Sequence, residues 1–184
     1  RKNRPDVPYS NPAVPVNIGL RRARGEVIIL QNAECVHAGP DVIERMVAPH
    51  RTRKNLAIFP AISARTPEGQ HWHWYVHSKL DSGPRPFFFC GSVRREIAHR
   101  LRGLDEDFKF YGFDDDFFAM CLQSAGVEFA FRDDIVVHHQ WHPGTNCYGL
   151  QSNSELFRQK ADDLLTGKRG PESNLGHEWG DLES

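Results

Sequence analysis

The 184-residue chain is 39% apolar and 11% aromatic, which supplies enough apolar surface for a core and excludes a disordered protein. The net charge is −1, and no arrangement of basic and aromatic residues matches a nucleic-acid module, so nucleic acid is not an expected partner. Four widely separated cysteines without a CxxC pair predict neither a structural zinc site nor a disulfide framework. The absence of a long apolar run or a signal pattern predicts a soluble, cytoplasmic protein without a transmembrane segment.

The amino-terminal part is expected to lead into a buried strand. Residues 1–16 contain four prolines, which predicts an extended arm or loop. Asn17 is expected to cap a short helix that ends at Gly25, and residues 26–30 (EVIIL) have the β-branched character of a buried strand. The polar sequence QNAEC follows, so we expect it at the carboxyl edge of a sheet, where open α/β folds bind ligands.

The middle of the chain alternates helix and strand signals. The pair Gly39 and Pro40 is expected to open a helix that ends before Pro49, and residues 55–61 (NLAIFPA) predict the next strand. Residues 71–77 (HWHWYVH) alternate strictly, with histidines on one face and tryptophans on the other. A metal site and a half-exposed edge strand both explain this pattern, but no carboxylate accompanies the histidines on their face.

The second half continues the alternation. Residues 86–90 (PFFFC) predict a short strand, and Ser92 is expected to cap a helix that stops at Gly103. Residues 115–124 predict a further helix. Two more strands are expected after it, at residues 127–131 and 135–137.

These signals predict an α/β domain over residues 1–165 with a mixed, mostly parallel sheet flanked by helices. From residue 166 the sequence turns polar and glycine-rich. Residues 166–184 are therefore expected to form a mobile tail.

An acidic stretch between residues 105 and 116 carries six carboxylates, interleaved with aromatic residues. Buried carboxylates without partners are costly, whereas aromatic residues favour burial, so this stretch is expected at the apolar wall of a site. The alternative is that residues 114–116 form the negative first turn of a helix, where acids complement the helix dipole. Both interpretations can hold for different acids of the stretch.

Two polar clusters follow predicted strands: Asn32 with Glu34 early in the chain, and His138, His139 and His142 late. Mn²⁺ or Mg²⁺ accepts carboxylate, amide and imidazole ligands together and could join the two clusters. His138 and His139 point to opposite faces if their strand continues, so only one of them is expected to be a ligand.

Three sequence stretches carry a resemblance to a known family. NIGLRRARGEVIILQNAE resembles the segment of inverting, GT-A-fold glycosyltransferases of the family 2 type that leads into their D-x-D metal motif. GSVRREIAHRLRGLDEDFKFYGFDDDFF resembles the galactosyltransferase-like carboxyl half of such enzymes, and VVHHQWHP resembles their late metal-binding histidine. The similarity runs in the same order from about residue 11 to residue 143.

The resemblance implies a metal site and a base. It places Asn32 and Glu34 where the family has the two aspartates of D-x-D, with Glu34 as the direct ligand. His139 is the first choice for the late ligand and His138 the second. Asp114 and Asp115 fall at the family's acidic pair, which implies that Asp114 binds the acceptor hydroxyl and Asp115 deprotonates it.

The resemblance also implies two binding surfaces. The residues expected to bind the donor are Asn17, Arg21 and Arg22. An acceptor sugar needs an apolar face beside polar groups, and the residues expected to bind it in one cleft with Asp114 are Trp74, His77, Gly91 and Ser92. The alternative is that Trp72 and Trp74 simply fill the core.

The function implied is metal-dependent, inverting transfer of a sugar from a nucleotide-sugar donor, with a UDP-sugar first, to a glycan or other hydroxyl acceptor. Only sixteen residues precede Asn17, whereas the family holds the nucleoside in a strand, helix and strand before the metal motif. A carboxyl-terminal part of a transferase, with a separate nucleotide-binding half as partner, is therefore expected.

Two other functions stay open at the sequence level. A noncatalytic carbohydrate-binding or assembly module would keep the fold and use Trp72, Trp74 and Trp141 as stacking faces. A metal-dependent hydrolase built on the histidine and aspartate clusters would turn over without a nucleotide sugar.

Overall fold

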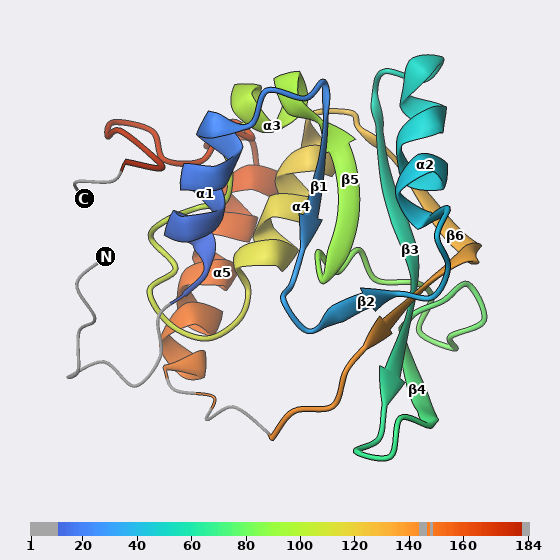
Figure 1. Cartoon of the computed structure of the whole chain (residues 1–184). Helices are drawn as coiled ribbons and strands as arrows, with labels where there is room; N and C mark the ends of the chain where they lie inside the picture. Colours follow the sequence, from blue (N-terminus) through green and yellow to red (C-terminus); the bar gives the residue numbers. More distant parts are fainter. Residues whose placement is uncertain (1–10, 144–146, 148, 182–184) are drawn as a thin grey trace. The chain divides into compact units, whose positions relative to one another are not determined.

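The computed structural model describes residues 11–143, 147 and 149–181 (Figure 1). The described chain forms two compact units whose segments alternate along the sequence. The sheet unit comprises residues 25–95 and 127–143, and the helical unit comprises residues 11–24, 96–126 and the described residues from 147 to 181. These boundaries do not coincide with the one predicted at residue 165.

The sheet unit contains six strands in the order β1-β5-β3-β6-β2, with β4 paired to one end of β3. The strands are β1 (Val27–Gln31), β2 (Cys35–His37), β3 (Leu56–Arg65), β4 (His71–Val76), β5 (Cys90–Arg94) and β6 (Glu128–His139). The mixed α/β class is confirmed, as are the strands predicted at residues 26–30 and 71–77.

The prediction of a mostly parallel sheet is wrong, because among the described residues only β3 and β6 pair in parallel. The β3–β4 pair is antiparallel because a turn of residues 66–70 joins the two strands directly. A parallel pair needs a crossover of a dozen or more residues, and hydrophobic strand patterns alone do not reveal which connection is a crossover.

The centre of the sheet is β3, which is buried through Ala64. Its apolar sequence on both faces is typical of a central strand. Phe59 packs against Phe88, Phe129 and Phe131, with ring centroids 4.9, 5.1 and 5.4 Å away. The register between β3 and β6 shifts after Pro60, which lacks the N–H that a regular ladder needs.

Strand β6 continues past this irregularity as one long strand, whereas two were predicted. Its continuation carries the chain to His139, at the end of the strand.

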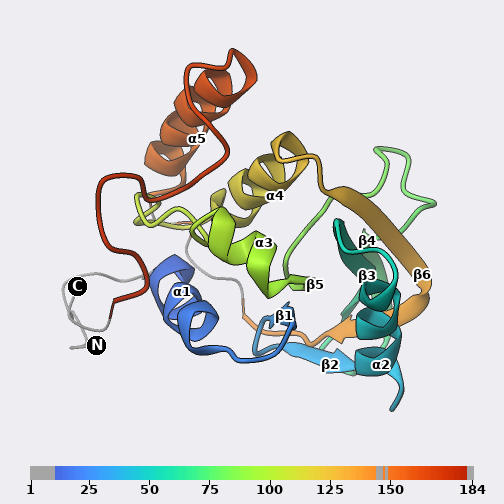
Figure 2. The same ribbon diagram turned by 90° about the horizontal axis from the view of Figure 1, so that it is seen from above.

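Helix α2 (Val42–Val47) covers one face of the sheet near β5 and β6 (Figure 2). It begins just after Pro40 and ends before Pro49, in agreement with the predicted boundaries. A 3₁₀ turn, η1 (Ala48–Arg51), follows it directly. Val42 and Met46 are its buried residues, and the Met46 sulfur lies 3.9 Å from the Cys90 sulfur of β5.

The helices of the helical unit are α1 (Ala13–Arg22), α3 (Arg95–Arg100), α4 (Asp114–Ser124) and α5 (Leu150–Leu165). The first residue of α3, Arg95, still belongs to the sheet unit. The predicted helix at residues 115–124 is confirmed as α4. Helices α4 and α5 pack together, and Phe113 stacks on Phe157 with ring centroids 5.1 Å apart (Figure 2). Helix α5 was not anticipated by the sequence analysis.

The predicted arm at residues 1–16 is wrong for residues 13–16, which form the start of α1. Pro12 stands at the N-cap and Pro15 in the first turn, where backbone N–H groups have no helical partner and proline is tolerated. Residues 1–10 of the predicted arm lie outside the described residues.

The described part of the predicted tail is anchored, so the expectation of mobility is wrong there. Ser173, Asn174 and Trp179 are buried. The Ser173 N–H donates to the Leu101 carbonyl over 2.9 Å, and the Gly180 N–H donates to the Glu106 carboxylate over 2.7 Å. Hydrogen bonds and one tryptophan therefore hold a segment whose composition is otherwise polar.

The longest described helix, α5, has 16 residues. No helix in the described part of the chain is both long and apolar enough to cross a membrane.

Candidate metal centre and acidic cluster

Three potential metal ligands meet at one end of the sheet unit. One ligand atom each from Glu34, His139 and His142 lies within 4.8 Å of the others. The Glu34 carboxylate is 3.5 Å from His139 Nε2, and the two imidazole rings have centroids 5.3 Å apart. The antiparallel pairing of β2 with β6 places Cys35 opposite His139, so the residue before β2 necessarily lies at the end of β6.

The donor set suits a divalent cation such as Mn²⁺, which accepts both carboxylate and imidazole ligands. His139 is buried, whereas His142 is exposed and Glu34 half-buried, so the cluster is open on one side. Burial is the main cause that lowers the pKa of His139. The lowered pKa keeps the imidazole neutral, which is the form that coordinates a metal.

Neighbouring groups hold these ligands in place. His139 packs against Phe89 and Tyr75, with ring centroids 5.1 and 5.4 Å away. The Gln140 N–H donates to the Glu34 carbonyl over 2.9 Å, which ties the turn before β2 to the end of β6. The Asn32 amide donates to the Glu34 carboxylate over 3.2 Å. In this geometry Asn32 orients Glu34, as outer-shell partners of metal ligands do.

His138 lies on the opposite face of β6 and is not part of the cluster, as strand alternation predicts. Its ring contacts the Arg65 guanidinium, with 2.8 Å between Arg65 Nη2 and His138 Nε2. Burial, Arg65 and His71 lower the pKa of His138, in that order of effect. The cluster therefore contains His139, the first choice of the sequence analysis, together with His142 in place of His138.

The acidic cluster lies in the helical unit at the start of α4. Asp114, the first residue of the helix, is buried, and its carboxylate accepts a hydrogen bond of 3.2 Å from the Asn11 amide. Phe113, at the N-cap, has φ of +71°, a left-handed conformation that turns the chain sharply into the helix. Burial raises the pKa of Asp114.

Asp115 is half-buried and is the most perturbed acid of this cluster. Burial, followed by the charges of Asp114 and Asp116, raises the pKa of Asp115 to about 7. Its Oδ1 accepts a hydrogen bond of 2.9 Å from the Asp116 N–H. A carboxyl group with a pKa near neutral can accept a proton at physiological pH, which is the property of a general base.

The other acids of the stretch are structural. The Lys160 ammonium of α5 bridges Asp105 and Asp107, with distances of 2.7 and 2.8 Å. Glu106 accepts hydrogen bonds from the Asn17 amide and the Gly180 N–H. These three acids fasten the loop before α4.

The predicted donor-binding residues belong to the helical unit and differ in their exposure to solvent. Asn17 is fully buried, donates to the Leu104 carbonyl and the Glu106 carboxylate over 2.8 Å each, and accepts from the Leu104 N–H. Its amide is therefore occupied, so the donor-binding and capping roles predicted for Asn17 do not fit. Arg21 donates to the Trp179 carbonyl over 2.8 Å, and Arg22 is exposed.

Two predicted acceptor-binding residues are also buried. The Ser92 hydroxyl donates to the Met46 carbonyl and lies 3.0 Å from His50 Nε2, whose N–H it accepts, so it is fully engaged inside the sheet unit. Gly91 lies beside it in β5, and a Cβ there would come within 3.0 Å of the Phe88 ring. Ser92 was expected to cap a helix, but it lies inside β5, which pairs with β1 through Arg94.

Trp74 and His77 remain accessible candidates in the sheet unit. Both are half-buried, and their rings lie 4.7 Å apart. Trp72 is 67% exposed, so the alternative that both tryptophans fill the core is wrong for Trp72. The predicted common cleft of these residues with Asp114 stays a prediction.

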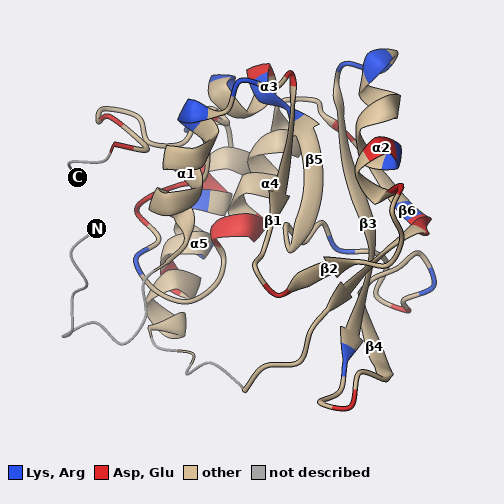
Figure 3. Cartoon of the chain, viewed as in Figure 1, with Lys and Arg blue, Asp and Glu red and all other residues tan. Residues whose placement is uncertain are grey.

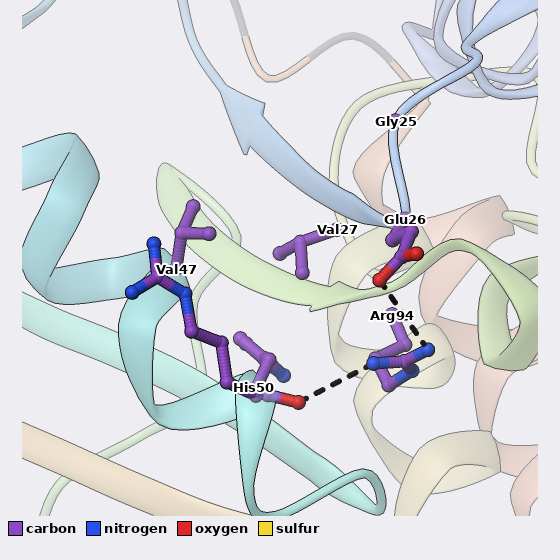
Figure 4. A pocket seen from close by; sticks show the side chains of 7 residues that line it. Gly25, Glu26, Val27, Val47, His50 and Arg94 are labelled. Atoms are coloured by element: carbon purple, nitrogen blue, oxygen red, sulfur yellow. Dashed lines mark hydrogen bonds and ion pairs between the residues drawn. The ribbon is translucent and has the colours of Figure 1, made fainter.

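A separate hollow of about 290 Å³ lies beside the start of β1 (Figure 4). Arg94 projects into it, donates to the His50 carbonyl over 3.3 Å and lies 3.9 Å from the Glu26 carboxylate. Burial, then Arg94, lowers the pKa of His50 to about 4, so His50 is neutral. No predicted site residue lines this hollow, whose lining residues are Gly25, Glu26, Val27, Val47, His50, Arg51 and Arg94.

Comparisons with known proteins place this arrangement among glycosyltransferase folds. No family model and no curated protein matches the sequence. Among solved structures, the mannosyltransferase PcManGT from Pyrobaculum calidifontis in complex with GDP-Man and Mn²⁺ matches with a TM-score of 0.57 and 18% identity over 86% of this chain. GalNAc-T7 in complex with UDP, GalNAc and Mn²⁺ matches with a TM-score of 0.51 and 16% identity over 69% of this chain.

The chain spans 45% of the first matched structure and 30% of the second. The likeness shows a GT-A-like glycosyltransferase fold for this chain.

Proposed function

We propose that this chain is part of an inverting, metal-dependent glycosyltransferase of the family 2 type. It would transfer a sugar from a nucleotide-sugar donor, a UDP-sugar in the first instance, to a hydroxyl group of a glycan. The observation that carries the proposal is the cluster of Glu34, His139 and His142 at strand ends of a chain with a glycosyltransferase fold. The two matched glycosyltransferases were crystallised with Mn²⁺, which supports Mn²⁺ or Mg²⁺ as the cofactor.

Glu34, His139 and His142 would hold the cation, with Asn32 orienting the carboxylate. When bound, the cation would neutralise the charge that develops on the departing diphosphate. Arg22, and Arg21 if it leaves the Trp179 carbonyl, would add positive charge to a donor diphosphate. A separate nucleotide-binding half is proposed as the partner that completes the donor site.

Asp115 would act as the general base that removes the acceptor hydroxyl proton. Its pKa of about 7 supports this role, because the ionised carboxylate is available at neutral pH and still has proton affinity. Asp114 would orient the hydroxyl. A single displacement by the activated hydroxyl on the face opposite the leaving group inverts the anomeric carbon.

The metal centre is tested by titrating the protein with Mn²⁺ in a calorimeter. Glu34→Gln and His142→Gln should each weaken binding by about tenfold or more, since loss of one charged or imidazole ligand removes a direct bond. His177→Gln is the matched control, because His177 is an exposed histidine of the helical unit and no ligand of the cluster. Equal affinity of the wild type and Glu34→Gln would contradict the metal proposal.

A noncatalytic carbohydrate-binding module is the second candidate. The exposed Trp72 (67%) and Trp141 (52%) of the sheet unit favour it, since exposed indole rings offer stacking faces for sugars. This function predicts that neutral glycans bind without metal or nucleotide sugar and that Trp72→Ala abolishes binding, while no sugar is transferred under any condition. Sugar transfer would rule it out.

A further inference from the structure

A cluster of positive and titratable side chains lies on the sheet face opposite His139, where β3, β4 and β6 meet. Ser63 of β3 pairs with His138 of β6 and Arg65 with His71 of β4. Residues 63 and 65 share one face of β3, because side chains alternate along a strand. The cluster is thus separated by the thickness of the sheet from His139, which faces the other way.

Arg65 has an unusual set of partners in this cluster. Its Nη2 contacts the His138 ring, and its Nη1 makes a long hydrogen bond of 3.4 Å to the Gly69 carbonyl. Its Nε is buried and makes no hydrogen bond in the described part of the chain, where Arg65 also pairs with no carboxylate. The nearest acid in sequence, Glu68, lies exposed in the turn, where Figure 3 shows red beyond the blue end of β3.

A half-buried guanidinium is normally paired with a carboxylate or phosphate through its planar fork. Arg65 instead faces two imidazoles, which cannot neutralise it. A buried N–H without a partner costs free energy, and an unneutralised cation adds to that cost. An anion that lies against the guanidinium would neutralise the charge, and a small shift of the Arg65 side chain would expose the buried Nε so that it donates to the anion.

His71 and Trp74 complete the surface. The Ser63 hydroxyl lies 2.7 Å from His71 Nδ1 and fixes the imidazole, which leaves Nε2 for another partner. Trp74 packs beside His71, with ring centroids 4.7 Å apart and an angle of 44° between the rings. A half-buried indole next to polar hydrogen-bonding groups is the usual combination for binding a sugar ring.

We propose that Arg65, His71, His138 and Trp74 form a subsite for an acidic sugar of a glycan, a uronate or a sulfated sugar. Arg65 binds the anionic group, the imidazoles donate to it or to neighbouring hydroxyls, and Trp74 stacks on the ring. This subsite goes beyond the transferase proposal, because it requires neither the metal centre nor the acidic cluster, and it predicts which glycans the chain selects.

The test measures binding of four probes by calorimetry without Mn²⁺ or nucleotide sugar: a uronate oligosaccharide, a sulfated oligosaccharide, a neutral oligosaccharide of equal length, and inorganic sulfate. At least one acidic oligosaccharide should bind about tenfold or more tightly than the neutral one, since a charge-assisted bidentate contact distinguishes them. The comparison between uronate and sulfate ester identifies the anionic group. Inorganic sulfate should bind far more weakly, because it lacks the sugar ring.

Arg65→Gln should remove the preference for the acidic probe, whereas Arg53→Gln should keep it. Arg53 is the matched control, since it is an exposed arginine of the same unit that is paired with Glu128. If both variants bind the acidic probe equally weakly, the preference comes from the net charge of the protein and not from Arg65, and the proposal is overturned. Equal binding of acidic and neutral probes by the wild type would also overturn it.

A second measurement covers the case in which Arg65→Gln fails to fold. In the wild type, the acidic probe should shift the NMR signals of the Trp74 indole N–H and the Arg65 Nε–H, while the Trp179 indole signal stays in place. Unchanged signals of Trp74 and Arg65 at saturating probe would overturn the proposal. Because neither metal nor donor is present, this outcome is independent of whether the chain transfers sugar.

Discussion

At the scale of single residues, Asp115 is the group whose chemistry the fold alters most among the acids of the α4 first turn. Its pKa is raised to about 7, so the folded protein binds a proton that the unfolded chain releases near pH 4. A raised carboxyl pKa stabilises the fold at acidic pH, and this contribution is lost as pH rises through the folded value.

Asp115→Asn should therefore remove part of the pH dependence of stability. The wild type should lose more unfolding free energy between pH 4 and pH 8 than Asp115→Asn does, as measured by urea denaturation at each pH. Transfer by the wild type should rise with pH through about 7, as the base ionises. In Asp115→Asn, turnover should fall by about 10²-fold or more.

Asp116→Asn is the comparison variant: it keeps the proposed base and should retain transfer, while the loss of a neighbouring charge should lower the pKa of Asp115. If Asp115→Asn transfers sugar at nearly the parental rate while Asp114→Asn does not, the roles of Asp114 and Asp115 are reversed. If neither substitution changes the rate, the proposed mechanism is wrong for this chain.

At the scale of elements, Asn17 joins α1 to the loop that follows α3. Its amide makes three hydrogen bonds of 2.8 Å to Leu104 and Glu106, all inside the helical unit. Asn17→Ala would leave a buried N–H and a buried carboxylate without this partner. The free energy of unfolding should fall by about 2 kcal/mol or more.

The measurement is urea denaturation, with Arg22→Ala as the control on the exposed side of the same helix. The control should change stability by less than about 0.5 kcal/mol. An Asn17→Ala variant as stable as the control would show that these hydrogen bonds contribute little, and would reopen a ligand-binding role for Asn17.

The elements also show why part of the sequence analysis failed. Apolar periodicity and glycine stops predicted α4 and the strand β1 correctly, because both depend on local pattern. Asn17 was misassigned because asparagine is typical of helix caps, whereas its partners lie 87 and 89 residues away in sequence. The helix cap predicted at Ser92 was wrong for the same reason, since the hydrogen-bond partner of Ser92, His50, lies far away in the sequence.

At the scale of the whole molecule, the sequence predicted the elements better than their pairing. Strand directions depend on which connections cross over, and the direct turn between β3 and β4 made that pair antiparallel. The meeting of Glu34 with His139 was predictable, because polar residues that follow strands gather at sheet ends. The choice of His142 over His138 was not, because it depends on the path of the chain after β6 ends.

The central claim is that this chain takes part in metal-dependent, inverting sugar transfer. It is tested most directly by incubating the protein, together with the nucleotide-binding half proposed as its partner, with a UDP-sugar of known anomeric configuration and glycan acceptors, with and without Mn²⁺, and following the product by NMR. The account predicts a glycoside of inverted configuration that forms only with Mn²⁺ and is lost in Glu34→Gln. A product of retained configuration, or equal turnover without metal, would contradict it.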